Sequence, residues 1–356
     1  MEQPEECSRP QVWNEIENLP QLKRSSAALI LIAFLLFVGC QSAKEGESSK
    51  PSKSEQTKIL PSSTGARCEV ILVCTEKVWN SRALNPLKNE LLRPQPGLPQ
   101  PEPYFSIMRV DPANFKNVIQ RNKAIIVVEE SDTARFRWFR NLYAKPQNVA
   151  LITYTTFQDI YNLTARHRRE IFEKFRAQDL KSTRLTLLKS GAKWQDATKN
   201  QKLKILMPPG YSRVVHKDNF SMYFAQSAKT HHVIMVHTRP WDPDGELPDE
   251  WKIIEIRDSL TILHTQASRP GSYTVVDTTI RPLSRTYNLN GRLTTEMRGL
   301  FKSVNDFLGG PFYTLVLFDE DRKLMVFIDA FMQAVGQNKR NMLMEMEVIA
   351  RSIDLK

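Results

Sequence analysis

The sequence predicts an α+β fold in which two mixed sheet-plus-helix halves follow a disordered lipoprotein tether. Strand-like segments occur in groups between helix-like segments, an order typical of α+β domains, whereas a doubly wound parallel sheet alternates single strands with helices. The stretch 41–54 contains almost nothing apolar to bury, which is typical of a flexible tether. About 300 residues follow it, enough for two domains with cores of their own.

A short apolar run, residues 27–38, lies directly behind Lys23 and Arg24 and is followed by Gly39 and Cys40. A helix needs about 20 apolar residues to cross a bilayer, so this run is too short to span one. A basic start, a short apolar run and a small residue before a cysteine are typical of a lipoprotein signal. We expect cleavage after Gly39 and lipidation of Cys40; the alternative is a buried strand or core helix with an incidental cysteine.

The signal divides the start of the chain into a removed segment, 1–39, and a lipidated cysteine with its tether, 40–59. The acidic, polar stretch 1–22 is unusual ahead of a signal and suggests a start assigned too far upstream. Gln41 follows the cysteine, instead of the aspartate that retains many lipoproteins at the inner membrane. We therefore expect lipid anchoring in the outer membrane, on its periplasmic face, with exposure at the cell surface as the alternative.

The chain is basic, with a formal net charge of +11. Residues 1–40 hold three basic and five acidic residues, so their removal leaves +13. In a cytosolic protein this charge would indicate nucleic acid, which we do not expect for an exported one. It favours an anionic envelope polymer, lipid head groups or another envelope protein as partner. A solvated basic face without a specific partner is nevertheless the favoured interpretation.

The first half, predicted over residues 60–197, should hold four strands and two helices. A series of prolines between them predicts an extended crossover. Cys68 and Cys74 fall in one strand, about 20 Å apart, so they should be buried thiols and not a disulfide. The expected strands are 68–75, 104–110, 123–130 and 148–154, and the expected helices are 81–93 and 157–188.

A polar stretch, 195–202, marks the predicted boundary before the second half, residues 198–356. Its apolar periodicity predicts helices over 250–265 and 339–353. Several strands are expected between 273 and 331. The individual strands that we expect in this half are 204–207, 219–225, 232–238, 313–319 and 323–331.

Several short stretches together resemble a known family. They are 98–103 with Phe105, Arg121-Asn122, Tyr143-Ala144 with Pro146-Gln147, Arg298-Gly299-Leu300, 309–312, and Lys339-Arg340. In this order the chain, from about Leu60 to its end, is similar to the bacterial envelope lipoproteins known as domain of unknown function 4837. The resemblance implies a Gram-negative lipoprotein with no assigned activity, cofactor or catalytic residue, so there is no catalytic residue to carry over. Whether the protein is an enzyme stays open, with a non-enzymatic role favoured.

Two stretches are candidates for binding a partner. The prolines around Gln100 and Glu102 predict a rigid strip that loses little entropy on binding, although an architectural role is the favoured alternative. Trp241 opens a loop, 241–246, whose acids and aromatic ring suit a carbohydrate. The alternative function is therefore an envelope polysaccharide hydrolase or carbohydrate-binding protein that uses this loop.

No metal or cofactor is expected. Asp242, Asp244 and Glu246 alternate before and after a glycine like part of a calcium loop, but the loop is too short and lacks the closing bidentate glutamate. His231 and His237 lie about 20 Å apart along a strand, too far to share a zinc ion. The sequence contains no nucleotide-binding glycine motif, serine-hydrolase motif or metalloprotease motif.

Overall fold

The computed structural model describes residues 60–265 and 269–355. These form helices and three sheets, which confirms the predicted α+β class. Gly39, Cys40 and the tether, 40–59, lie outside the described residues, so the predictions for them stay predictions. Within the described part of the chain, no helix is both long and apolar enough to cross a membrane.

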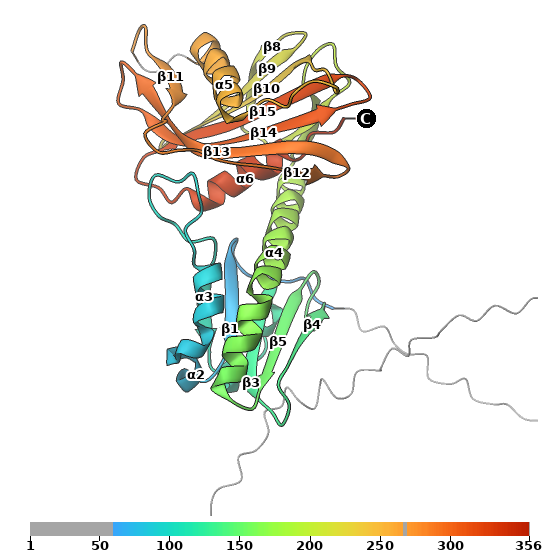
Figure 1. Ribbon diagram of the computed structural model, residues 1–356, viewed down its shortest axis with the longest axis vertical. Coiled ribbons are helices and arrows are strands. Elements are labelled where there is room, and N and C mark those ends of the chain that lie inside the picture. Colours follow the sequence, from blue (N-terminus) through green and yellow to red (C-terminus); the bar gives the residue numbers. More distant parts are fainter. Residues whose placement is uncertain (1–59, 266–268, 356) are drawn as a thin grey trace, which may run out of the picture.

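The first sheet has five strands in the order β2-β1-β3-β5-β4. Four of them run parallel, and β4 joins antiparallel at one edge (Figure 1). The central strands are almost wholly apolar because both faces of the sheet are covered. The bounds are β1 (Glu69–Val73), β2 (Ser106–Val110), β3 (Ala124–Glu130), β4 (Arg135–Arg140) and β5 (Asn148–Tyr154).

Three helices pack on one face of this sheet. The predicted helix 81–93 is a 3-10 turn (Arg82–Leu84) followed by α3 (Asn85–Leu91), with a proline in the first turn of α3 that cannot donate a backbone hydrogen bond. Helix α2 (Glu76–Asn80) precedes this range and was not predicted. The longest helix, α4 (Phe157–Lys189), matches its predicted range closely. It begins with a capping box between Thr156 and Asp159.

The second sheet has the strand order β11-β13-β14-β15-β10-β9-β8, with β12 paired to β13, and all its pairings are antiparallel. Apolar side chains on both faces of this sheet are buried in hydrophobic cores. The bounds are β8 (Ser212–His216), β9 (Phe220–Gln226), β10 (Thr230–Pro240), β11 (Tyr273–Val276), β12 (Leu283–Leu289), β13 (Arg292–Val304), β14 (Gly309–Asp319) and β15 (Leu324–Ala334).

One face of the second sheet packs against α5 (Glu250–His264), and the other packs against α6 (Arg340–Ala350) and the hairpin β6 (Lys193–Asp196)–β7 (Lys204–Met207). The predicted domain boundary between residues 197 and 198 falls inside this hairpin. The boundary itself stays a prediction.

Helix α4 runs from one half to the other (Figure 1), and α6 contributes side chains to both cores. The 33-residue α4 begins beside the first sheet and ends at the second, where Leu187 joins the core under β14 and β15. In return, Met344 of α6 belongs to the core of the first half. The halves therefore share packed elements.

Candidate functional site

A buried network of ion pairs lies where α4, α6 and β13 meet. Arg298 of β13 joins two carboxylates, from Nε to Glu296 Oε1 at 2.8 Å and from Nη2 to Glu347 Oε2 at 2.8 Å. Arg351 also joins both, at 2.7 Å from Nη2 to Glu296 Oε2 and 3.0 Å from Nε to Glu347 Oε1. Arg176 of α4 pairs with Glu347 Oε2. Both halves thus contribute to one charged cluster.

The carboxylates of this network remain ionised. Burial alone would raise the pKa of Glu347, but the neighbouring guanidinium groups outweigh burial and lower its pKa to about 2. Glu296 is likewise buried, and three arginines hold its pKa below the ordinary value. A general acid or base needs a pKa near the working pH. The network therefore positions α4, α6 and β13 and does not exchange protons at neutral pH.

Gln100 and Glu102, the predicted partner-binding residues, form hydrogen bonds within the molecule. Glu102 accepts the backbone N–H of Lys339 at 2.6 Å through Oε1 and that of Arg340 at 2.9 Å through Oε2. Gln100 Oε1 accepts from Lys339 Nζ at 3.1 Å. A carboxylate at a helix N-terminus accepts hydrogen bonds from the unpaired backbone N–H groups of the first turn, and its negative charge interacts favourably with the helix dipole. The proline-rich segment is therefore a strap that holds the start of α6. Partner binding by Gln100 and Glu102 stays a prediction.

The loop after β10 places Trp241 half-buried, with its ring centroid 5.0 Å from that of Phe318. Asp242, Asp244 and Glu246 are exposed, and Asp242 Oδ1 accepts the N–H of Asp244 at 3.2 Å. Within the described ranges, no group of three or more His, Cys, Asp or Glu residues is arranged to hold a metal ion.

The histidines of β10 contact different residues and do not form one cluster. His232 Nδ1 lies 3.1 Å from the hydroxyl of Tyr211, and burial lowers the pKa of His232. Burial also lowers the pKa of His237. His231 stands outside this pair, at the edge of a cavity.

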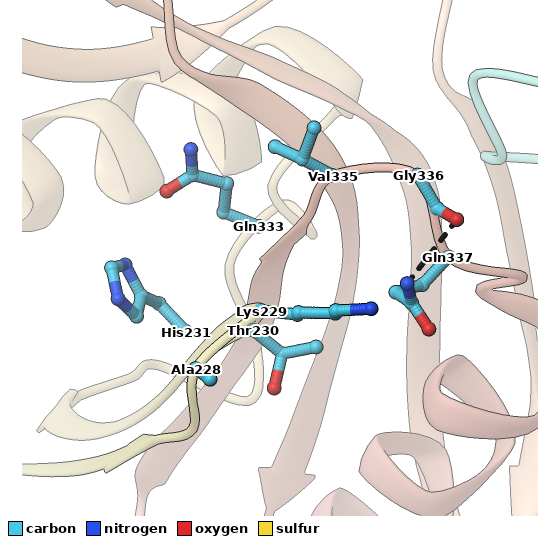
Figure 2. Close-up of a pocket in the computed structure, with 8 residues that line it drawn as sticks. All are labelled: Ala228, Lys229, Thr230, His231, Gln333, Val335, Gly336 and Gln337. Carbon is cyan, nitrogen blue, oxygen red and sulfur yellow. Dashed lines mark hydrogen bonds between the residues drawn. The ribbon is translucent and has the colours of Figure 1, made fainter.

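One cavity, of about 510 Å³, lies at the end of the second sheet where β10 begins and β15 ends (Figure 2). His231 and Gln333 are register partners on these strands and lie on one side of it. Lys229, Thr230 and Gln337 lie on the other side. The lining holds donors and acceptors of hydrogen bonds and no carboxylate.

A second cavity, of about 470 Å³, lies between the edge strand β4 and helix α4. Trp138 and Arg140 of β4 face Lys174 and Lys181 of α4, and Pro146 lies beside them. Lys174 Nζ sits 4.3 Å from the ring centroid of Trp138. We call this cavity with these five residues the basic groove.

A third cavity, of about 290 Å³, lies between the β12–β13 and β14–β15 turns and includes Asp319, Glu320 and Asp321. Asp319 forms an ion pair with Arg322, at 3.6 Å. Phe318, which contacts Trp241, also lines it.

The carboxyl groups with a raised pKa lie outside these three cavities. Burial raises the pKa of Glu129 to about 7, and it also raises the pKa of Asp179, Asp258 and Asp329. Asp179 Oδ1 lies 2.9 Å from Lys123 Nζ, and Asp329 Oδ1 accepts from Arg257 Nε at 3.1 Å. These two carboxylates have structural partners.

Cys68 and Cys74 are free and buried, as predicted. Burial raises the pKa of each thiol to about 11. A thiol needs a lowered pKa to act as a nucleophile at neutral pH, so neither is a catalytic candidate.

Sequence reasoning missed the residues that line the basic groove on β4, because that strand alternates arginine with aromatic side chains and lacks an apolar run. The alternation itself is the signal that could have found it. It also missed the ion-pair network, whose members are far apart in sequence.

Comparisons with known proteins identify two families. Residues 63–187 match the family described as "Domain of unknown function (DUF8532)", and residues 191–352 match "Domain of unknown function (DUF4837)". The predicted resemblance to the second family therefore holds for the second half, and the first half matches another family. A search of curated proteins found no significant match.

Solved structures that are similar to the chain include a point mutant of the protein Mog1, at 11% identity and a TM-score of 0.31, and the Saccharomyces cerevisiae Ran-binding protein Mog1p, at 10% identity and 0.32. Each match covers 46% of this chain and 96% of the other. The sequence match assigns residues 191–352, the second half of the chain, to the DUF4837 family model.

Proposed function

We propose that the protein is a lipid-anchored envelope protein that works by binding or scaffolding, held through Cys40 in the outer membrane with its folded part in the periplasm. The observation that carries the binding role is the lining of the two larger cavities. Both present cationic, amide and aromatic side chains without a carboxylate. Such linings suit the noncovalent capture of polar or anionic groups, on an anionic envelope polymer or another envelope protein.

The shared elements support a scaffolding role. Because α4 and α6 each pack in both halves, a partner bound at one half is held at a defined position relative to the other. Buried ion pairs at the junction add to this, since they tolerate few alternative geometries.

The anchoring part is tested by Cys40→Ala in the full chain, with Ser42→Ala as the matched control. Because the thiol of Cys40 is the proposed site of acylation, the Cys40→Ala protein should leave the membrane fraction of fractionated cells. Ser42→Ala should remain membrane-bound. An unchanged membrane fraction for Cys40→Ala would contradict the proposal.

The second candidate function is carbohydrate binding or polysaccharide hydrolysis at the loop 241–246. It is favoured by the third cavity, which brings three further acids near Trp241. Glycoside hydrolysis requires two carboxyl groups roughly 5 to 9 Å apart across the scissile bond.

Single substitutions decide between the two candidates. Asp242→Ala, Asp244→Ala and Glu246→Ala remove exposed carboxylates, so each should change the free energy of unfolding by no more than about 0.5 kcal/mol. Under the binding proposal each variant also complements a deletion strain. If one variant fails to complement while its melting temperature and abundance are unchanged, the hydrolase or a metal site replaces the binding proposal, and that carboxylate becomes the leading site residue.

A further inference from the structure

The positive charge of the chain is concentrated in its first half. Residues 60–189 contain 21 Lys and Arg against 12 Asp and Glu, a net charge of +9, whereas residues 190–356 contain 22 against 19, a net of +3. The second half is the longer of the two, so the higher net charge of the first half comes from its composition and not from its length. An anionic surface would therefore attract the first half more strongly than the second.

Within the first half, the basic groove carries cations that the structure leaves without an ion-pair partner. Lys174 pairs with Glu170, at 2.9 Å, and Trp138 Nε1 donates to the same carboxylate at 2.7 Å. Arg140 and Lys181 line the groove, and neither has an ion-pair partner among residues 60–265 and 269–355. Their charges are available to an external anion.

The groove lies beside the point where the chain continues toward Cys40. Lys145 donates its N–H to Pro61 O at 2.9 Å, and its carbonyl accepts from the N–H of Ser63 at 3.2 Å. Lys145 immediately precedes Pro146, which lines the groove. Leu60, the first described residue, is 20 positions after Cys40. A lipid on Cys40 would therefore keep the groove side of the first half within one tether length of the bilayer, about 25 Å for a flexible chain of 20 residues.

We propose that the basic groove binds the phosphates of anionic lipid head groups in the membrane that carries the anchor. Arg140 and Lys181 supply the charge, and Trp138 supplies an amphipathic ring of the kind that is enriched at membrane interfaces. The inference extends the proposed function, because the placement of the groove relative to the bilayer rests on anchoring through Cys40. Docking would fix the orientation of the long axis of the molecule and present the second sheet, with its cavity at Lys229 to His231, to the periplasm.

The test measures vesicle binding of the full chain carrying Cys40→Ala, so that acylation plays no part. Co-flotation is compared between vesicles of neutral phosphatidylcholine and vesicles with about a third phosphatidylglycerol, and the ratio of the two partition coefficients is the readout. Any contribution of residues 1–59 is the same in every variant. Binding that shows no preference for anionic vesicles would overturn the proposal.

The decisive variant is Arg140→Gln/Lys145→Gln/Lys181→Gln, which includes Lys145 because this exposed lysine flanks the groove. Its control is Lys199→Gln/Lys217→Gln/Arg239→Gln, which removes the same number of exposed Lys and Arg charges from the second half. Each basic residue near an anionic surface strengthens binding about fivefold, so the groove variant should lose about 100-fold of its preference. The control should lose less than about threefold. Circular dichroism and melting temperature verify that both stay folded.

Two further outcomes overturn the inference. Equal losses for the groove variant and the control would mean that binding follows total charge and not the groove. If the groove variant loses binding to soluble dextran sulfate but keeps its vesicle preference, the ligand is an anionic polymer. The Cys40→Ala fractionation experiment fails or succeeds independently of these results, so failure of the lipid anchor and failure of the groove are distinguishable.

Discussion

Glu129 shows how a single partly buried residue can make stability depend on pH. It lies near the end of β3, its Oε1 atom is buried without a hydrogen-bond partner among the described residues, and burial raises its pKa to about 7. The ordinary value is 4.5. The folded protein therefore resists losing this proton, while the unfolded chain loses it readily.

We predict that Glu129→Gln raises the melting temperature at pH 8 and leaves it nearly unchanged at pH 4.5. The wild-type free energy of unfolding falls as the pH rises from about 4.5 through about 7, because the unfolded state deprotonates first. The glutamine side chain is neutral at both pH values, so the variant does not lose stability as the pH rises. Thermal melts at both pH values measure the effect.

Glu130→Gln, at the neighbouring exposed position, is the matched control for this prediction. It should shift the melting temperature little at either pH. The same shift for Glu129→Gln at pH 4.5 and at pH 8 would mean that burial of the ionised carboxylate is not the cause.

Helix α6 has no side-chain cap of its own, since its N-cap is Lys339 in helical conformation. The cap comes from Glu102, more than two hundred residues earlier in the chain. Two charge-assisted hydrogen bonds to backbone N–H groups fix both the start of the helix and the position of the strap.

We predict that Glu102→Ala lowers the free energy of unfolding by about 1 to 2 kcal/mol, the usual cost of losing an N-terminal cap. Urea denaturation measures it. Glu173→Ala, which removes an exposed carboxylate from the surface of α4, should change stability by no more than about 0.5 kcal/mol. Equal effects for the two variants would show that Glu102 contributes no capping energy.

At the scale of the whole molecule, the two halves are joined by helices that both cores need. Leu187, near the end of α4, is buried in the core of the second half, and Met344 of α6 is buried in the core of the first. The ion pair between Arg176 and Glu347 crosses the same junction. Unfolding one half would expose apolar surface and buried charge on the other, which is costly.

We therefore predict that the chain starting at Leu60 folds and unfolds in a single cooperative transition. Calorimetry should give one peak whose calorimetric and van't Hoff enthalpies agree. The isolated first half, residues 60–189, should be markedly less stable, because it leaves Leu187 without its core and Arg176 without Glu347. Two resolved transitions in the longer chain would contradict the prediction.

The sequence alone determined the elements whose signal is local. Helix α4 and strands β5 and β7 lie where apolar periodicity predicted them, because a long amphipathic stripe or a run of β-branched residues has few alternative structures. The buried thiols followed from the length of one strand. The resemblance of the second half to the DUF4837 family, which the match over residues 191–352 confirms, was carried there by the stretches 298–300, 309–312 and 339–340.

Only the tertiary structure decided what the charged and polar residues do. The pairing of Glu102 with α6, and of Arg176 with Glu347, joins residues that no local pattern connects. The basic groove likewise needs an edge strand and a helix face to meet. Apolar residues reveal their burial through spacing along the chain, whereas a charge acquires its role from partners that the fold brings to it from elsewhere in the sequence.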